Sequence, residues 1–469
     1  MAAPGSTPSG PAAGASLDAL ASRPVKGVGR RIASNTGLLL GAKILATLTG
    51  LATLLLATQT LSAAEFGTIV FIHAYMLFFA EVATFQSWQT MIRFGTDDLV
   101  SGDRGSLTRL FRFGYTLDVI SVLLGYGLAV AAFQMVTVVA SWLPGLEPGE
   151  GVPVETLQTY INLYCLVILV RCTSTSVGIF RLFDKFTVLA VEALVMPITR
   201  FAGAVVAAVN GWGLPGFLAA WFFGSFCQYL FLTVAGVLEL RRRGLLGEVV
   251  AAKIRFFRPR RPMWSFVIKS NIDSTLATGV SNLPQLLVMA MFGPVWNGVF
   301  KIAEEVAKLL TKGFALLDQV IYPELAKMVS EGRSDRIWRV VSRTGLILLA
   351  VGLAFSAIII LFGDAALMAI FGDAYGQSAV LAAMLVPAAA LMGAGAPLYP
   401  IFYAADRPGG AIIVRSASLL VYVATFFIAA FTVGRLAPGF ASIAANGFGV
   451  VMLVISAKRV LKAIGRSGT

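Results

Sequence analysis

Residues 295–323 read VWNGVFKIAEEVAKLLTKGFALLDQVIYP and combine the length of a membrane span with a high density of charge. A helix that crosses a bilayer needs about 20 residues at 1.5 Å rise each. At about 100° per residue, the charged side chains of this stretch fall within an arc of roughly 140°. They are Lys301, Glu304, Glu305, Lys308, Lys312 and Asp318. The pattern therefore predicts a membrane helix with one charged face and one apolar face.

The charged face needs surroundings other than lipid, because a charge at mid-bilayer costs at least about 2.5–3.5 kcal/mol. The helix can line a water-filled cavity, lie on the membrane surface as an amphipathic helix, or pair its charges with neighbouring helices. Within the helix, Lys301 and Glu305 have the i, i+4 spacing of an ion pair, and so do Glu304 and Lys308. We favour the cavity wall, because three lysines are hard to neutralise by packing alone.

The composition of the whole chain is that of a polytopic membrane protein. The 469 residues are 57% hydrophobic and 13% charged, with a mean hydropathy of +0.82, whereas soluble domains carry about 25% charged residues. The net charge of +13 does not indicate nucleic acid here, because basic loops mark the cytoplasmic side of a membrane protein. The three cysteines lie in apolar segments and there is a single histidine. We therefore expect neither a disulfide framework nor a metal site.

Twelve apolar segments follow a tail, residues 1–34, that is rich in Ala, Gly, Ser and Pro and ends in a basic cluster. We expect this tail to be disordered, with no cleavable signal peptide. The segments are 35–57, 67–91, 113–140, 158–180, 186–209, 214–238, 266–292, 296–321, 341–362, 378–400, 411–433 and 439–457. With the N-terminus inside, the inside loops and tails hold 29 lysines and arginines, and the outside loops hold only Arg435. The positive-inside rule therefore predicts that both termini are cytoplasmic.

The connection 239–265 is strongly basic and divides the twelve segments into two groups of six. We interpret it as an anchor on anionic lipid, with binding of a cytoplasmic partner as the alternative. The two groups echo one another, because EFGTIVFIHAYMLFF at 65–79 resembles WNGVFKIAEEVAKLL at 296–310, which places Gly67 opposite Gly298. Internal repeats of this kind are typical of transporters.

The predicted fold is therefore all-α, with two six-helix bundles around a central cavity. The predicted parts are the tail 1–34, a bundle at 35–238, the linker 239–265, a bundle at 266–457 and a basic cytoplasmic tail at 458–469.

Three stretches of sequence carry a family resemblance. They are LGAKILATLTGLATLLLATQTLSAAEFGTI at 40–69, GVFKIAEEVAKLL and YPELAKMVSEGR within 298–333, and PLYPIFYAADRPGGAIIVRSASLLV at 397–421. In order and spacing they resemble bacterial polysaccharide transporters, the Wzx-type flippases of the multidrug/oligosaccharidyl-lipid/polysaccharide (MOP) exporter superfamily. The resemblance implies MATE-like bundles, alternating access, and a lipid-linked oligosaccharide substrate that carries a pyrophosphate. The mixed charge of 301–318 departs from it and leaves open whether the lumen is net cationic.

Other ionisable residues lie within the predicted spans. Arg171 and Glu192 lie near mid-depth of adjacent spans, so mutual neutralisation is the simplest interpretation. Arg200 has no obvious partner nearby in sequence, and we predict that it contacts an anion, because a planar guanidinium suits phosphate oxygens. Lys43 either faces the lumen or extends its amine towards the interface. The predicted lumen residues are Lys301, Lys308, Lys312, Arg200, Lys43, Glu304 and Glu305.

Four residues are candidates for coupling transport to a proton or sodium gradient: Glu81, His73, Asp118 and Glu192. A carboxylate in low dielectric has a raised pKa and titrates near neutrality, unless a base holds it ionised. Among these acids, Glu81 has the fewest basic neighbours in sequence. An unperturbed histidine titrates near physiological pH, although a hydrogen bond from His73 to a neighbouring helix is the simpler interpretation.

The sequence contains no Walker A, GxSxG or HExxH motif. We therefore expect no enzyme activity and no cofactor, with transport driven by an ion gradient or by downstream consumption of the substrate. A membrane-embedded polymerase or glycosyltransferase is one rival, but the longest outside loop, about 141–157, is too short for its catalytic groups. A cation-coupled multidrug exporter of the same superfamily and a transport-inactive scaffold are the other rivals.

The predicted function is export of a polyprenyl-pyrophosphate-linked oligosaccharide across the bacterial cytoplasmic (inner) membrane, for synthesis of a lipopolysaccharide or exopolysaccharide. The expected partners are this substrate, membrane lipids, a coupling proton or sodium ion, and a polysaccharide polymerase or export machinery. No nucleic acid is expected.

Overall fold

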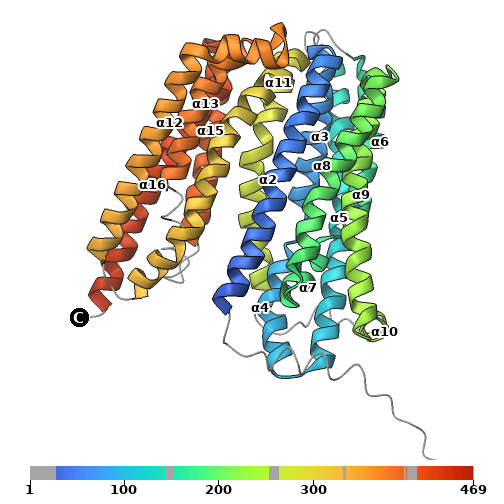
Figure 1. The fold of residues 1–469 in the computed structure, drawn as a ribbon, viewed down its shortest axis with the longest axis vertical. Helices are drawn as coiled ribbons and strands as arrows, with labels where there is room; N and C mark the ends of the chain where they lie inside the picture. Colours follow the sequence, from blue (N-terminus) through green and yellow to red (C-terminus); the bar gives the residue numbers. More distant parts are fainter. Residues whose placement is uncertain are drawn as a thin grey trace, which may run out of the picture. The chain divides into compact units, whose positions relative to one another are not determined.

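The computed structural model describes residues 28–142, 152–252, 263–330, 334–395, 398 and 409–467, and the regular elements in these ranges are helices (Figure 1). The first part contains α2 (Val28–Thr60), α3 (Ala63–Ala83), α4 (Ser87–Val100), α5 (Arg104–Trp142), α6 (Val154–Cys165), η1 (Leu166–Val170), α7 (Ser174–Leu182), α8 (Phe186–Val209), α9 (Gly213–Arg242) and α10 (Leu246–Ala251). The second contains α11 (Met263–Ser330), α12 (Ser334–Phe371), η2 (Asp373–Tyr375), α13 (Ser378–Gly395), α15 (Gly409–Thr432), η4 (Gly434–Leu436) and α16 (Ala437–Ser467).

Within the described residues, eleven stretches are long and apolar enough to cross a membrane. One of them, Ser281–Leu310, contains a break in α11 at Gly293, where φ is 77° and ψ is −178°. Divided there, α11 supplies two of the twelve predicted apolar segments, and each of the other ten overlaps a helix. The prediction of an all-helical polytopic membrane protein is therefore confirmed.

Local sequence explains where α3 begins. The Ser62 amide donates to Glu65 Oε2 at 2.9 Å, and the Glu65 amide donates to the Ser62 hydroxyl at 3.3 Å. This reciprocal pair is a capping box, which satisfies amides that have no partner at the start of a helix. Inside the spans, hydroxyls donate to the carbonyl one turn back, as Thr47 does to Lys43 at 2.9 Å. Such bonds satisfy a polar group where water is absent.

Small residues allow α8 and α9 to pack closely. A Cβ atom on Gly203 would lie 2.9 Å from Cβ of Ala220, and one on Gly224 would lie 3.0 Å from Cβ of Arg200. Close approach of backbones at small residues is the usual way in which membrane helices associate. This contact fixes Arg200 against α9, a placement that bears on the site described below.

The packing of the described residues divides the chain into two compact units. Unit 1 comprises residues 1–54, 79–131 and 162–271, and unit 2 comprises 55–78, 132–161 and 272–469. These units are defined by contacts, whereas the predicted bundles at 35–238 and 266–457 are defined by sequence repetition. The division into those two bundles, and the cavity between them, therefore stay predictions.

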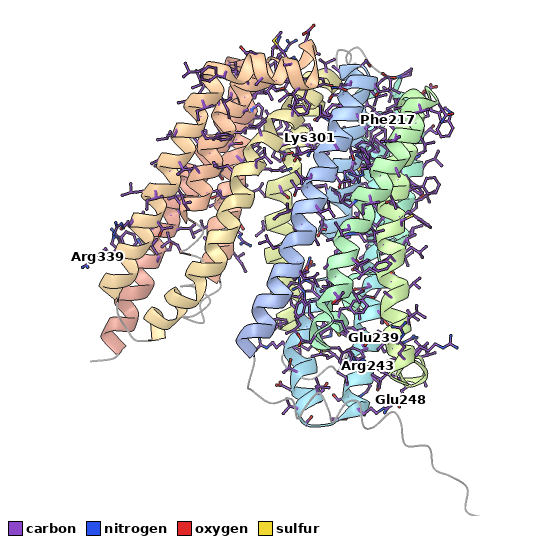
Figure 2. All side chains as sticks on the ribbon, viewed as in Figure 1. Phe217, Glu239, Arg243, Glu248, Lys301 and Arg339 are labelled. Carbon is purple, nitrogen blue, oxygen red and sulfur yellow. The ribbon has the colours of Figure 1, made fainter. Side chains whose placement is uncertain are left out.

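The start of the basic connection, up to residue 252, packs within unit 1. The Arg104 guanidinium lies 2.9 Å from the carboxylate of Glu248, and the Arg243 guanidinium lies 2.8 Å from that of Glu239. Figure 2 labels Glu239, Arg243 and Glu248 near the ends of α9 and α10. Val249 of α10 is buried in the same apolar cluster as Met91 of α4. The basic residues from Lys253 to Arg261 lie outside the described residues, as do residues 1–27 of the predicted N-terminal tail.

Candidate functional site

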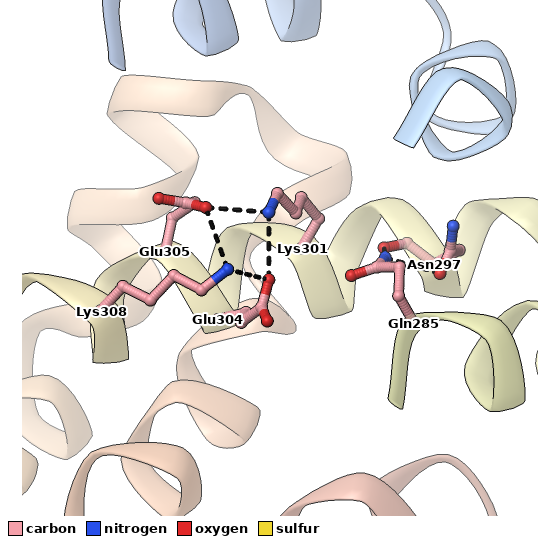
Figure 3. Close-up of polar contacts among 6 residues, drawn as sticks. All are labelled: Gln285, Asn297, Lys301, Glu304, Glu305 and Lys308. Atoms are coloured by element: carbon pink, nitrogen blue, oxygen red, sulfur yellow. Dashed lines mark hydrogen bonds and ion pairs between the residues drawn. The ribbon is translucent and has the colours of Figure 1, made fainter. Parts of the chain in front are cut away.

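Four charged residues of α11 form a closed ring of ion pairs. Lys301 Nζ lies 3.0 Å from Glu304 Oε2 and 2.8 Å from Glu305 Oε1. Lys308 Nζ lies 2.8 Å from Glu304 Oε2 and 3.5 Å from Glu305 Oε1. Figure 3 shows the four side chains turned towards one another on one side of the helix. We call these four residues the charged ring.

The charged ring is neutral and incompletely buried. Its two lysines and two glutamates cancel, and the side chain of Lys308 is 39% exposed, against 21% for Lys301 and 17% for each glutamate. These ion pairs run along one helix: the two i, i+4 pairs are those predicted from the spacing, and two i, i+3 pairs accompany them. The side chains of Lys312 and Asp318 lie outside those that the structure describes, so their predicted place in the lumen stays a prediction.

Two buried amides extend the polar face of α11 beyond the ring. Asn297 is 0% exposed and Gln285 is 3% exposed. Gln285 Nε2 donates to Asn297 Oδ1 at 2.6 Å, and Asn297 Nδ2 donates to the Gly67 carbonyl at 2.8 Å. Figure 3 places Asn297 and Gln285 beside the ring, and Asn297 lies four residues before Lys301, which is about one helical turn. Unit 2 therefore carries a cluster of polar side chains on the two segments of α11 that Gly293 separates.

Unit 1 contains a second polar centre, where two spans are interrupted. Residues 84–86 separate α3 from α4, and residues 171–173 separate η1 from α7. Asp118 of α5 is 2% exposed and joins the two interruptions. Its carboxylate accepts from the Ser87 hydroxyl at 2.8 Å and from the Thr175 amide at 2.8 Å. One carboxylate thus caps a backbone amide in the first turn of α7 and binds a side-chain hydroxyl in the first turn of α4, and helix dipoles favour negative charge at both places.

Arg171 lies at the same interruptions and pairs with Glu81. Its Nη2 contacts the Glu81 carboxylate, its Nη1 donates to the Thr84 hydroxyl at 2.8 Å, and its guanidinium lies 5.6 Å from the Tyr229 ring centre. Discontinuous helices within a membrane are where transporters commonly place polar ligands, because unwound backbone is tolerated only when its polar groups have partners. The interrupted spans, with Asp118 and the Arg171–Glu81 pair, form a candidate site in unit 1.

The predicted pairing of Arg171 with Glu192 is wrong. Glu192 accepts a hydrogen bond from Gln228 Nε2 at 2.5 Å, and Arg171 takes Glu81 instead. Adjacent spans and similar depth do not determine which way two side chains point around their helices. For the same reason, the scarcity of bases near Glu81 in sequence was misleading, because a base 90 residues away holds its carboxylate.

Three other residues predicted to face the lumen or to couple an ion lie outside both polar centres. Arg200 contacts Met196 Sδ at 3.3 Å and the Ser225 hydroxyl at 3.4 Å, and its guanidinium lies 5.0 Å from the Trp221 ring centre. Lys43 is exposed on α2, and His73 is half-buried in α3. Arg200 therefore sits against neutral and aromatic groups of α8 and α9.

Sequence reasoning missed several of these polar residues. Gln285 and Asn297 carried a usable signal, because amides in apolar spans are rare and costly. Ser87 and Thr175 carried none, since a hydroxyl next to a helix start is common on any protein surface. Among the described residues, no three His, Cys, Asp or Glu side chains gather closely enough to hold a metal ion.

Comparisons with known proteins show the fold. No protein-family model matches the chain. The chain is 27% identical over 352 residues to the "Inner membrane protein YghQ" of Escherichia coli (strain K12), which covers 74% of this chain and 95% of that protein.

Solved structures of membrane transporters superpose on most of the chain. An inward-facing multidrug resistance MATE family transporter of the MOP superfamily matches with a TM-score of 0.69 and 14% identity, over 92% of this chain and 99% of that one. An outward-facing MATE family transporter of the same superfamily matches with a TM-score of 0.62 and 14% identity, over 95% of this chain and 100% of that one. The lipid II flippase MurJ, in an inward closed conformation, gives a TM-score of 0.59 and 14% identity, over 91% of this chain and 90% of that one. The protein is thus a multi-pass membrane protein with a MATE-like transporter fold.

Proposed function

We propose that this protein is a flippase that moves a lipid-linked oligosaccharide across the bacterial cytoplasmic membrane for surface polysaccharide synthesis. The observation that carries the proposal is the partly exposed charged ring on a membrane helix, in a fold that it shares with MATE transporters and with a flippase named for lipid II. The family resemblance in the sequence supplies the Wzx-type assignment and the polyprenyl-pyrophosphate-linked repeat unit.

The chemistry of the charged ring suits the sugar part of such a substrate. Each lysine ammonium has three donors and each carboxylate has about four acceptor positions, so the ring presents both kinds of group. Sugar hydroxyls both donate and accept, and they complement a neutral ring of this kind. A drug cation would instead favour an acidic site, and the ring holds as many bases as acids.

A pyrophosphate needs a cation that can exchange its present partner for a phosphate oxygen. Lys308 is the more exposed lysine of the ring, so we propose that it exchanges Glu304 or Glu305 for a phosphate oxygen. Arg200 contacts neutral groups and offers the planar fork that suits phosphate. Lys43 and Lys312 belong to the same proposed path, and Glu81, His73, Asp118 and Glu192 remain the candidates for ion coupling.

The rival function within the same fold is cation-coupled export of drugs. The likeness to MATE transporters favours drug export as much as it favours a flippase, because structures at 14% identity show the fold alone. The two functions differ in what accumulates when the protein is missing. A flippase leaves lipid-linked intermediates on the inside, whereas a drug exporter leaves the intermediates unchanged and raises drug sensitivity.

The test is a clean deletion in the native bacterium, complemented with the wild-type gene. We expect loss of a surface polysaccharide and accumulation of lipid-linked oligosaccharide, measured by mass spectrometry of the lipid extract and reversed by the wild-type gene. Normal polysaccharide with normal lipid-linked intermediates would contradict the proposal, and increased drug sensitivity in the same strain would support the rival.

A further inference from the structure

The start of α3 and the middle of α11 cross with almost no space between their backbones. A Cβ atom on Gly67 would lie 1.8 Å from the Pro294 carbonyl oxygen and 3.0 Å from the Gly298 amide nitrogen. One on Gly298 would lie 3.1 Å from the Phe66 ring and 3.2 Å from the Ala63 carbonyl oxygen. Glycine at such a crossing allows two membrane helices their closest approach.

The crossing joins positions that the internal repeat makes equivalent. Aligning Gly67 with Gly298 also aligns Phe66 with Asn297. The Asn297 carboxamide lies on the backbone of Gly67, and the Phe66 ring lies on the backbone of Gly298. Reciprocal contacts of this kind characterise two elements related by a twofold axis. The crossing of α3 with α11 in unit 2 therefore has local twofold character.

A small hydrogen-bond network closes the crossing. Asn297 Nδ2 donates to the Gly67 carbonyl at 2.8 Å, and Gln285 Nε2 donates to Asn297 Oδ1 at 2.6 Å and to the Asn297 carbonyl at 3.0 Å. The positive φ of Gly293 turns the chain between Gln285 and Asn297. A neutral hydrogen bond changes an equilibrium by a factor of only about 2 to 10. Such bonds hold a closed contact and still allow it to open within a transport cycle.

Two further contacts lie beside the crossing in unit 2. The Phe66 and Tyr375 rings meet edge to face with centroids 5.9 Å apart, and Gln59 Nε2 donates to the Ile370 carbonyl at 3.4 Å. Each joins the first repeat of the sequence to the second. Under the positive-inside orientation, these residues lie at the outer ends of their spans.

We infer that Asn297 is the positioning residue of an outer seal, in which its carboxamide clamps α3 to α11 and closes the charged ring from the outside. Asn297 precedes Lys301 by about one turn, or about 6 Å along the helix, so opening the clamp exposes the ring first. The outer position of the seal rests on the predicted orientation, and its opening to release a substrate rests on the proposed function.

The first test is thiol labelling, which needs no substrate. In a variant without its three natural cysteines, Val299→Cys provides a nearly isosteric reporter beside the crossing, because Val299 is 2% exposed. A membrane-impermeant maleimide is added outside intact cells. We expect Asn297→Ala to raise the labelling rate five- to tenfold.

Asn446→Ala is the matched control. Asn446 Nδ2 donates to the Ala388 carbonyl at 2.8 Å between α16 and α13, which is the same chemistry away from the crossing. We expect it to leave the labelling rate unchanged. Equal labelling in the wild-type, Asn297→Ala and Asn446→Ala proteins would overturn the seal. If Asn297→Ala does not accumulate, Gln285→Leu removes both hydrogen bonds from Gln285 to Asn297, and the same change in labelling rate is expected.

The second test asks whether the crossing must open during transport. Phe66→Cys with Tyr375→Cys is joined by a short, cleavable bis-thiosulfonate reagent. We expect export of surface polysaccharide to fall at least tenfold and to recover on reduction. The control cross-link joins Phe292→Cys to Phe426→Cys, whose rings lie 6.1 Å apart within the second repeat, and we expect export to continue.

The two tests separate the seal from the proposed function. Undiminished export with a complete Phe66–Tyr375 cross-link would show that the crossing is static and would overturn the inference. If the wild-type protein exports no polysaccharide, the proposed function is contradicted. If Asn297→Ala still raises the labelling of Val299→Cys in that case, the seal is retained.

Discussion

The charged ring of α11 and the interrupted spans of unit 1 solve the problem of charge in a membrane in different ways. In the ring, partners lie three or four residues apart on one helix and retain some exposure. In unit 1, Arg171 and Glu81 are 90 residues apart, and Asp118 accepts hydrogen bonds from two helices at once. The ring forms wherever its helix forms, whereas the unit 1 network exists only when four elements are packed.

This difference separates charges that hold the fold from charges that are free to act. Same-helix pairs contribute only about 0.2–0.5 kcal/mol each, so the ring can exchange a partner for a ligand at little cost to stability. Removing one member of a buried pair costs about 3–5 kcal/mol, because the remaining charge is left uncompensated. Substitutions in unit 1 should therefore affect folding first, and substitutions in the ring should affect transport first.

The largest expected effect comes from breaking the Arg171–Glu81 pair. Glu81→Gln leaves the Arg171 charge inside unit 1, and we expect the free energy of unfolding to fall by about 3–5 kcal/mol. Thermal unfolding of the protein purified in detergent measures the loss. Glu155→Gln at the exposed start of α6 is the control, with a change within about 0.5 kcal/mol. Equal stability of the two variants would show that the pair is not structural.

A smaller loss of stability is expected at Asp118. Asp118→Ala leaves the Thr175 amide without its acceptor, which costs about 1–3 kcal/mol for a buried group left unsatisfied. The Ser87 hydroxyl keeps the Thr175 hydroxyl as a partner at 3.1 Å. Asp118→Asn keeps an acceptor oxygen and should lose less. Chemical denaturation in detergent ranks the two variants, and an Asn variant less stable than the Ala variant would contradict the capping role.

The ring should show the opposite balance. Lys308→Gln should lower stability by less than about 1 kcal/mol, because its partners are on the same helix and its side chain is partly exposed. Export of surface polysaccharide should fall at least tenfold, and Lys308→Arg should retain part of it, since the charge remains. Lys458→Gln, which removes a lysine stacked on Trp338 away from the ring, is the control. Normal export by Lys308→Gln would mean that the ring is structural.

Lys43 should show the smallest effect. It is exposed on α2, so we expect Lys43→Gln to change stability by less than about 0.5 kcal/mol. A contact worth up to about 1 kcal/mol would lower the export rate no more than about fivefold. Export rates in cells matched for protein abundance measure this. If Lys43→Gln lowers export as much as Lys308→Gln does, the principal anion contact lies on α2 and not on α11.

How well each region could be predicted depends on the sequence separation of its contacts. The i, i+4 ion pairs of the charged ring could be predicted from spacing alone, because a helix brings residues i and i+4 together whatever surrounds it. The Gly67–Gly298 relationship could be predicted as a repeat, but the repeat alone does not show that the two backbones meet. The Arg171–Glu192 pairing was wrong, because helix rotation and not depth decides which side chains meet.

By itself, the sequence determined that this protein is a helical, polytopic membrane protein, and it predicted an orientation. Those conclusions depend on apolar length and on the distribution of charge, which are properties of the chain before it folds. Only the tertiary structure decided that Glu81 neutralises Arg171, that Asp118 joins α4 to α7, and that Asn297 lies on the backbone of Gly67. These contacts depend on how each helix is rotated and interrupted, which packing between distant segments determines and local pattern does not record.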